Sequence, residues 1–110
     1  MDMSIIPSRN APYNKAMKEI YSIERVIEIT NGKPVYLHYA FPSHRTVFYY
    51  SKKTRKVLER KDIDEVKSKD VFFLVQTEYI PLFVPKDTFE TAYKFKSNNI
   101  NISLIKYAHL

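Results

Sequence analysis

The first third of the chain carries apolar residues at helical spacing. They follow one another three or four positions apart, and the residues between them are mostly polar or charged. Asn10 suits the position that caps a helix, and Pro12 suits the first turn, where its missing amide hydrogen costs nothing. The pattern predicts a helix from about residue 12 to the mid-20s. Its apolar positions are Tyr13, Ala16, Met17, Ile20, Ile23 and Ile27.

The end of this helix can be placed in two ways. Asn31 and Gly32, followed by Pro34, suit either a cap after a helix or a tight turn between strands at 26–30 and 35–41. The β-branched residues before the turn would also suit a strand, but we favour a helix that continues to about residue 30. Gly32 is expected to have a positive φ in both cases.

From residue 35 the apolar pattern changes to a period of two, which is typical of strands. Turns at 42–44 and 51–54 would join three strands, at 35–41, 46–51 and 56–60. Together they would form an antiparallel β-ribbon. One face of its first strand would hold Val35, Leu37, Tyr39 and Phe41, and the other face would hold Tyr36, His38 and Ala40.

The middle of the chain contains the most apolar run. Residues 61–70 are polar with two isolated apolar anchors, which predicts a connection or one short helical turn. Residues 71–75 are continuously apolar, as expected for a strand that is covered on both faces at the centre of the core. Residues 80–84 are predicted to pair with them as an edge strand, because Pro81 cannot donate to a sheet ladder.

The last quarter of the chain predicts a helix and then a strand. Asp87 and Glu90 have the spacing of a capping box, in which each side chain satisfies a free amide at the helix start. A second helix is therefore expected near 87–97, before Asn98 and Asn99 break it. Apolar and polar residues then alternate from residue 100 to about residue 107, which indicates a final strand.

These elements define an α+β fold, a single domain over residues 1–110, with residues 1–10 as candidates for a flexible arm. We expect an N-terminal helix, a mostly antiparallel sheet of four to six strands and the helix near 87–97. Hydrophobic residues make up 45% of the chain and aromatic residues 15%, well above a disordered composition. The single glycine excludes Walker and dinucleotide-binding loops, which need several, and the lack of cysteine excludes disulfides and thiolate zinc sites.

The net charge of +6 is concentrated in one segment. Residues 45–61 hold seven basic residues and one acidic residue, whereas the rest of the chain holds 11 of each kind. Aromatic residues run directly into this segment, and rings beside cations are typical of surfaces that hold phosphates and stack on bases. The predicted nucleic-acid or partner-binding residues are Arg45, Tyr49, Tyr50, Lys52, Lys53, Arg55, Lys56, Arg60 and Lys61.

This segment supports three interpretations. The first is a non-catalytic nucleic-acid-binding protein, such as a DNA regulator or an accessory replication factor, that uses the basic β-ribbon. The second is a phage or mobile-element protein that docks on an acidic protein partner and inhibits or adapts it, since Tyr and Arg are enriched at interface hot spots. The third is ordinary surface, in which the aromatic rings pack inward and the cations keep a sheet edge soluble.

Catalysis and metal binding have no support in the pattern. His38, His44 and His109 are scattered, and no pair has the spacing that would join two imidazoles on a helix. Glu-x-Lys triplets at 59–61 and 65–67 match a nuclease motif, but that site needs a further carboxylate, and no acid lies between Glu28 and Glu59. We therefore expect no enzyme activity and no cofactor.

Several segments between about residues 46 and 95 follow a known order. They are Thr46 to Tyr50 as a strand, Asp62-Ile63 with Val66, Phe72 to Val75, Val84-Pro85-Lys86, and Asp87-Thr88-Phe89 as a helix start. In this order the chain resembles the C-terminal half of small bacterial pleckstrin-homology-like domains. The resemblance implies an antiparallel sheet closed by a helix, and a binding platform without catalytic residues.

The remaining expectations concern location and assembly. The N-terminus lacks the basic start and apolar run of a signal peptide, and the chain has no run of 18 apolar residues, so we expect a cytoplasmic protein with no membrane span. Abundant Lys, Ile, Asn and Tyr suit an AT-rich genome, such as that of a phage or mobile element. A homodimer through a strand at 100–107 is one alternative, and pairing of that strand within the chain is the other.

Overall fold

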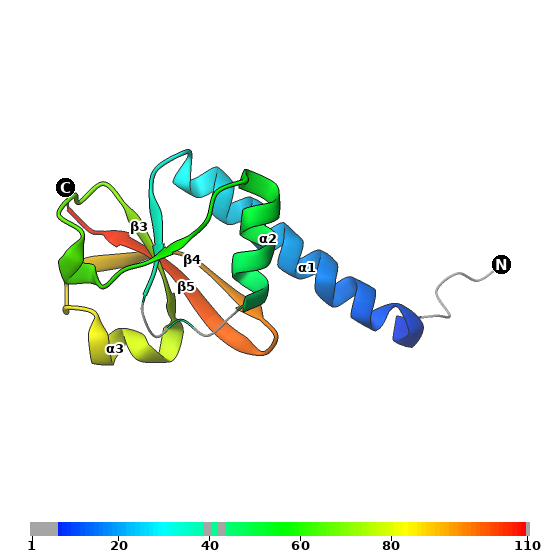
Figure 1. Ribbon diagram of the computed structural model, residues 1–110. Coiled ribbons are helices and arrows are strands. Elements are labelled where there is room, and N and C mark those ends of the chain that lie inside the picture. Colours follow the sequence, from blue (N-terminus) through cyan, green and yellow to red (C-terminus); the bar gives the residue numbers. More distant parts are fainter. Residues whose placement is uncertain (1–6, 39–40, 42–43, 110) are drawn as a thin grey trace.

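The computed structural model of the chain describes residues 7–38, 41 and 44–109, with side chains from Met17 onward except that of His44. In Figure 1, α1 extends well beyond the sheet, and its N-terminal end lies far from the C-terminus. The elements in chain order are α1 (Pro7–Thr30), β1 (Val35–Leu37), α2 (His44–Thr54), β2 (Glu59–Arg60), the 3₁₀ turn η2 (Ile63–Glu65), β3 (Phe72–Gln76), the 3₁₀ turn η3 (Thr77–Tyr79), α3 (Ile80–Phe83), β4 (Phe89–Ser97) and β5 (Ile100–Tyr107).

Five strands of the described residues form one mixed sheet in the order β2-β1-β3-β5-β4. β1 pairs in parallel with β2 and β3, and β5 pairs antiparallel with β3 and β4. Parallel neighbours need a crossover connection, and α2 provides it between β1 and β2. The α+β class and the number of strands are confirmed, and β2 and β4 are the two edges of the sheet.

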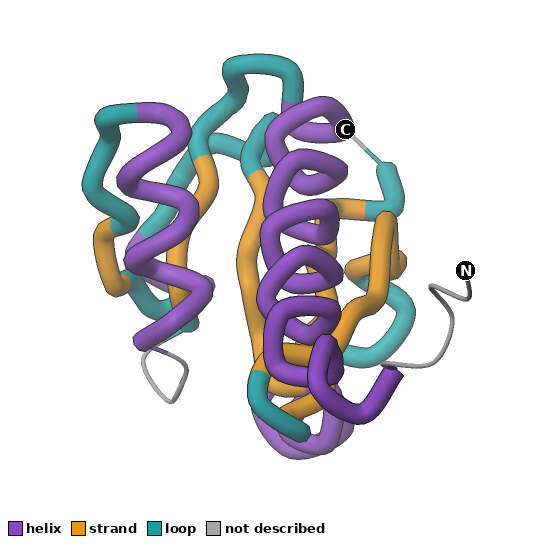
Figure 2. The backbone as a smooth tube through the Cα atoms, turned by 90° about the vertical axis from the view of Figure 1, so that its right-hand side faces the viewer, coloured by secondary structure: helices purple, strands orange, loops and turns teal. Residues whose placement is uncertain are grey.

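α1 and α2 lie side by side over one face of the sheet (Figure 2). Ile23 and Val26 of α1 and Tyr50 of α2 are buried there against Leu74 of β3 and Leu104 of β5. Each fully buried aliphatic side chain of this kind contributes about 1.5–3 kcal/mol relative to the same side chain in water. This face therefore holds the larger part of the core.

The opposite face of the sheet has a second apolar cluster. Phe73 and Val75 of β3 and Ile105 of β5 are buried there, together with Ile63 of η2 and Val71. Because β3 is covered on both sides, its residues Phe72 to Val75 are all buried. The expectation that this run forms a strand at the centre of the core is confirmed.

The segment after α1 is a helix cap rather than a tight turn between two strands. It continues to Thr30, so the helical alternative for 26–30 is confirmed. Asn31 and Gly32 then have φ values of 45° and 84°. The backbone N–H of Lys33 donates to the carbonyl of Thr30 at 2.9 Å. The positive φ predicted for Gly32 is thus confirmed, and it closes the last turn of the helix.

The start of α1 differs from the expectation. The helix begins at Pro7 rather than near residue 12, so residues 7–10 of the predicted arm are helical. A proline is well tolerated at this first position, because the amide hydrogen it lacks would have no partner inside the helix. The rest of the predicted arm, residues 1–6, lies outside the described residues.

The strand predicted at 46–51 and the turn predicted at 51–54 are wrong, because both fall within α2. Thr46 and Tyr50 lie four residues apart and are only 1% and 6% exposed. A strand that buried both residues would also bury Phe48 between them, but Phe48 is 56% exposed, so the burial follows the helical period. Aromatic and β-branched residues favour strands, but this preference is weak and depends on context.

The basic segment is therefore not an antiparallel ribbon. β1 is three residues long, and the predicted continuation of this strand over 39–40 and the turn at 42–43 lie outside the described residues. β2 is shorter than the strand predicted at 56–60 and pairs in parallel with β1, with Tyr36 opposite Glu59. The alternation within β1 is confirmed, because Val35 and Leu37 face the helices and Tyr36 faces the other side.

The connection at 61–70 contains the short helical turn that was expected. The Asp62 carboxylate accepts a hydrogen bond from the Ile63 N–H at 2.8 Å, and the Glu65 carboxylate accepts one from the Asp62 N–H at 2.8 Å. These bonds belong to a capping box that starts η2. Its effect is to place Ile63 in the second apolar cluster.

The edge strand predicted at 80–84 is wrong, because this segment forms α3 directly after η3. Pro81 lies at the first turn of α3, a position that suits proline as well as a sheet edge does. Tyr79, Ile80 and Val84 pack on the second apolar cluster from there. The segment covers the sheet instead of extending it.

The helix predicted near 87–97 is also wrong, because most of these residues form β4. Asp87 has a φ of 62°, which is incompatible with the extended backbone of a helix cap. Phe95 and Ser97 are buried while Lys94 and Lys96 are exposed, as the period of a strand requires. Asn98 and Asn99, with φ values of 52° and 67°, form the two-residue turn that leads into β5.

The final strand, predicted from residue 100 to about 107, is confirmed as β5. It lies between β3 and β4, so both of its edges are paired within the chain. The intramolecular alternative is therefore confirmed, and a homodimer through this strand is excluded by its position. Most paired residues of the sheet are in the antiparallel pairs, as expected, while the parallel pairing of β1 was not predicted.

Candidate functional site

The nine residues of the predicted binding site do not form one surface. Tyr50 belongs to the core at 6% exposed, and burial raises the pKa of its phenol. It cannot stack on a base, so its predicted role is wrong. Tyr49, the other ring in the prediction, and Lys61 are each half-buried.

Arg45 forms a contact that joins three elements. Its Nε lies 3.2 Å from Oε2 of Glu19, whose side chain is 9% exposed. The Ser97 hydroxyl donates to the same carboxylate oxygen at 3.4 Å. An acidic group with so little water around it needs such partners, because an unpaired buried charge is strongly unfavourable. Arg45 therefore links the start of α2 to α1 and to the end of β4.

Two further basic residues are engaged within the chain. The Lys53 ammonium lies 3.0 Å from a carboxylate oxygen of Glu24 on α1. The Arg60 guanidinium donates to the carbonyls of His38 at 3.1 Å and Phe41 at 2.9 Å, and so fixes the chain that leaves β1. Lys53 and Arg60 therefore have structural contacts within the chain.

The remaining members of the predicted site lie at the C-terminal end of α2. Lys52, Arg55 and Lys56 are exposed and form no ion pair within the part of the chain that the structure describes. Phe48, one turn before Lys52, is 56% exposed, and its ring centroid lies 5.3 Å from the Lys52 ammonium. We call Phe48, Lys52, Arg55 and Lys56 the basic end of α2.

Local geometry explains how these side chains are held. Phe48 and Lys52 are four residues apart on a helix, which brings their side chains together. Arg55 follows the helix with a φ of 60°, and its N–H donates to the Ser51 carbonyl at 2.8 Å. Lysines in the last turn also complement the negative end of the helix.

Among the described residues, no group of three or more acidic, histidine or cysteine side chains could hold a metal ion. His38 is 1% exposed, and burial is the main reason that its pKa is lowered. Asp62 opposes this shift and Arg60 adds to it. The neutral His38 packs its ring 5.4 Å from that of Phe83, which indicates a core residue rather than a general base.

A second candidate surface was missed in the sequence. A groove of about 570 Å³ runs between α1 and β4, and Met17 and Tyr21 line its helical wall. Its strand wall includes Lys94 and Lys96, which were predicted to lie on a helix. The signal that could have found it is the alternation of aromatic residues and lysines from Tyr93 to Lys96, followed by the asparagine turn.

Comparisons with protein families, with curated proteins and with solved structures find no match to this chain. The resemblance of residues 46–95 to pleckstrin-homology-like domains therefore stays a prediction. Within the described residues, no helix combines the length and the apolarity that crossing a bilayer requires.

Proposed function

We propose that this protein binds single-stranded nucleic acid, without catalysis, at the basic end of α2. The observation that carries the proposal is the exposed ring of Phe48 with the Lys52 ammonium beside it. Arg55 and Lys56 continue the positive charge past the end of the helix. An exposed ring can stack on a base, and cations next to it can contact the phosphates on either side of that base.

A single strand suits this surface better than a duplex. Only an unstacked base offers its face to a ring on a protein surface, and bases in a duplex are already stacked on one another. Stacking on a ring and contacts with phosphates do not distinguish one base from another. We therefore expect binding with little dependence on sequence.

The number of basic side chains at the basic end of α2 sets how strongly the binding constant should depend on salt. Three phosphates neutralised by Lys52, Arg55 and Lys56 would give a slope of log K against log salt of about −2 for a single strand. Binding at this surface should thus be modest and clearly sensitive to salt. A slope near zero would contradict the proposal.

The test is fluorescence anisotropy of labelled single-stranded DNA, duplex DNA and RNA over a series of salt concentrations. We expect the single strands to bind more tightly than the duplex. The Lys52→Glu/Lys56→Glu variant should lose most of the affinity, because it reverses two of three phosphate contacts. Phe48→Ala should weaken binding about tenfold, the equivalent of one stacked base, without loss of stability, since the ring is exposed.

The matched control is Lys67→Glu/Lys69→Glu. It changes the net charge by the same amount, and both side chains are exposed in the connection between η2 and β3. The control should bind single strands almost as the unmodified protein does. Equal losses in the two double variants would show that only overall charge matters, and no loss in either would exclude the basic end of α2.

A further inference from the structure

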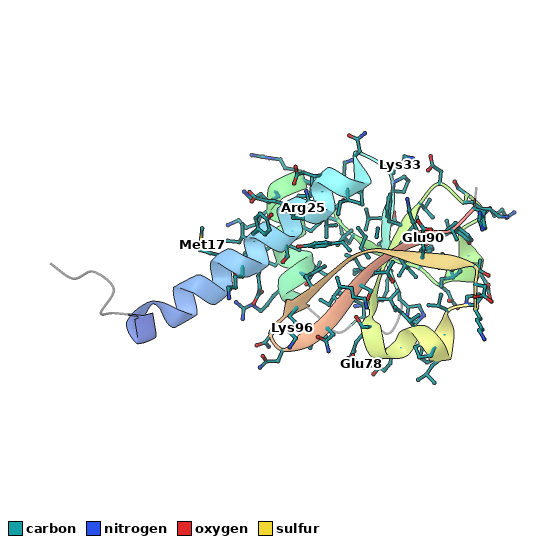
Figure 3. The ribbon with its side chains drawn as sticks, turned by 180° about the vertical axis from the view of Figure 1, so that it is seen from behind. Met17, Arg25, Lys33, Glu78, Glu90 and Lys96 are labelled. Atoms are coloured by element: carbon teal, nitrogen blue, oxygen red, sulfur yellow. The ribbon has the colours of Figure 1, made fainter. Side chains whose placement is uncertain are left out.

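The groove between α1 and β4 lies at an open edge of the sheet. Among the described residues, β4 is the last strand in the sheet order and pairs only with β5. In Figure 3, Met17 and Arg25 lie along α1, and Lys96 lies near the end of the hairpin that β4 forms with β5. The residues that line the groove are Met17, Lys18, Tyr21, Ser22, Tyr93, Lys94, Phe95 and Lys96.

The backbone of β4 can accept another strand at this edge. Ser97 and Ile100 flank a two-residue turn, so they form a hydrogen-bonded pair, and such pairs recur at every second residue. Lys94 and Lys96 fall between them, opposite Ser103 and Asn101. Their N–H and C=O groups therefore point away from β5, toward the groove. An added strand would pair with these groups, a mode of recognition that gives affinity through the main chain.

The two faces of β4 offer different chemistry to an added strand. Tyr93 and Phe95 face α1, where Met17 and Tyr21 are 48% and 60% exposed. Lys94 and Lys96 project from the opposite face. Successive side chains of an added strand alternate between these faces. One set would contact apolar groups and the other set would contact ammonium groups.

The charge of the groove selects among possible strands. Of the described residues that line it, three are lysines and none is acidic. A second copy of the chain would bring Lys94 and Lys96 close to the same residues of its partner, and opposed like charges destabilise a strand pair. A strand with acidic side chains would gain from the same lysines.

We propose that this groove binds an extended segment of a partner protein in which acidic and apolar residues alternate. The segment adds to β4 as a further strand, with its carboxylates toward Lys94 and Lys96 and its apolar side chains toward Met17, Tyr21 and Tyr93. This site shares no residue with the basic end of α2, so it is independent of the proposed nucleic-acid binding.

The test uses a labelled peptide as long as β4 in which Glu alternates with Val, titrated with the full chain in fluorescence anisotropy. We expect saturable binding at a stoichiometry of one peptide per chain. A peptide with the same composition in two blocks should bind weakly, because it cannot present the two chemistries on opposite faces. A peptide with Lys in place of Glu should not bind.

A matched pair of variants separates charge from main-chain pairing. Lys94→Ala removes the charge and keeps the N–H, whereas Lys94→Pro removes both. Proline is tolerated on the free side of an edge strand, so the sheet should survive, which circular dichroism and a thermal melt would verify. We expect Lys94→Ala to weaken peptide binding several-fold and Lys94→Pro to weaken it by a further factor of about ten. Equal effects would overturn strand addition.

Three other outcomes would also overturn the proposal. They are the absence of binding by any peptide, displacement of the peptide by single-stranded DNA in the Lys52→Glu/Lys56→Glu variant, and a concentration-dependent dimer that Lys94→Pro abolishes. The second outcome would make the groove a nucleic-acid site, and the third would assign it to a second copy. Since Lys52→Glu/Lys56→Glu should bind the alternating peptide normally, the groove proposal and the proposed function can fail separately.

Discussion

Several polar residues are part of the packing of this protein. Glu19 is buried between α1, α2 and the end of β4, where Arg45 and Ser97 contact it. His38 is buried beside Phe83. The pKa of His38 is lowered by its burial, so protonation of this residue should affect the free energy of unfolding.

The burial of His38 should make the free energy of unfolding depend on pH. Burial lowers its pKa below the ordinary value of 6.5, so the unfolded chain takes up a proton at a higher pH than the folded chain does. His38 is neutral in both states well above pH 6.5. As the pH falls through 6.5, the unfolded state gains the proton first and the free energy of unfolding decreases, by at most about 1.4 kcal/mol per pH unit.

Urea unfolding between pH 7.5 and pH 5.5 would measure this effect. His38→Gln should flatten the pH dependence, whatever its effect on stability at pH 7.5, because Gln takes up no proton. The control is His109→Gln, at an exposed position, which should keep the pH dependence of the unmodified protein. Parallel curves for all three proteins would show that His38 does not contribute.

At the scale of single residues, the sequence predicts where charge is concentrated along the chain better than it predicts which side chains contact one another. The concentration of charge in residues 45–61 is real, and Lys52, Arg55 and Lys56 are exposed as expected. The roles of Arg45 and Tyr50 could not be predicted, because they depend on contacts with residues far away in the chain. Glu19 and Ser97, which meet beside Arg45, are 78 positions apart.

At the scale of secondary structure, two segments with the same motif behave differently. Asp62 and Glu65 form a capping box at η2, whereas Asp87 and Glu90 have the same spacing at the start of β4. The difference lies in the following residues. Ile63 turns into the second apolar cluster, while the residues from Phe89 onward pair with β5 as a strand.

Removing the glutamate of each motif should separate their roles. Glu65→Ala deletes the acceptor of the Asp62 N–H and should lower the free energy of unfolding by about 1 kcal/mol. Glu90→Ala removes only an exposed ion pair with Lys106 and should change it by less than about 0.5 kcal/mol. Urea titrations of the two variants provide the measurement. Equal losses would mean that the box at η2 adds no more to stability than an exposed ion pair does.

The elements that the sequence predicts correctly are those with one dominant period. α1 and β5 have long, consistent patterns, and β3 is apolar throughout. Residues 46–51 and 87–97 contain aromatic residues that fit either period. In both segments the burial against the rest of the fold determines the structure, and local preference does not override it.

At the scale of the whole molecule, the sheet has a stable centre and two different edges. β3 pairs with β1 on one side and β5 on the other, and its faces are covered by the two apolar clusters. β2 is only two residues long, and both of its residues are exposed. The parallel pairing of β1 with β2 and β3 connects residues distant in sequence, so no local pattern could predict it.

Native-state hydrogen exchange should follow this arrangement. Amides of β3 and β5 can exchange only when the whole protein unfolds, which for a typical domain slows exchange by at least about 10³-fold relative to an unfolded chain. β2 and α3 should exchange through local opening, because they are short and bury few side chains. β4 should be intermediate, since no strand in the described part of the chain pairs with its outer amides at Lys94 and Lys96. Slow exchange at these two amides on addition of the alternating peptide would show that the groove gains a strand, and unchanged exchange would show that it does not.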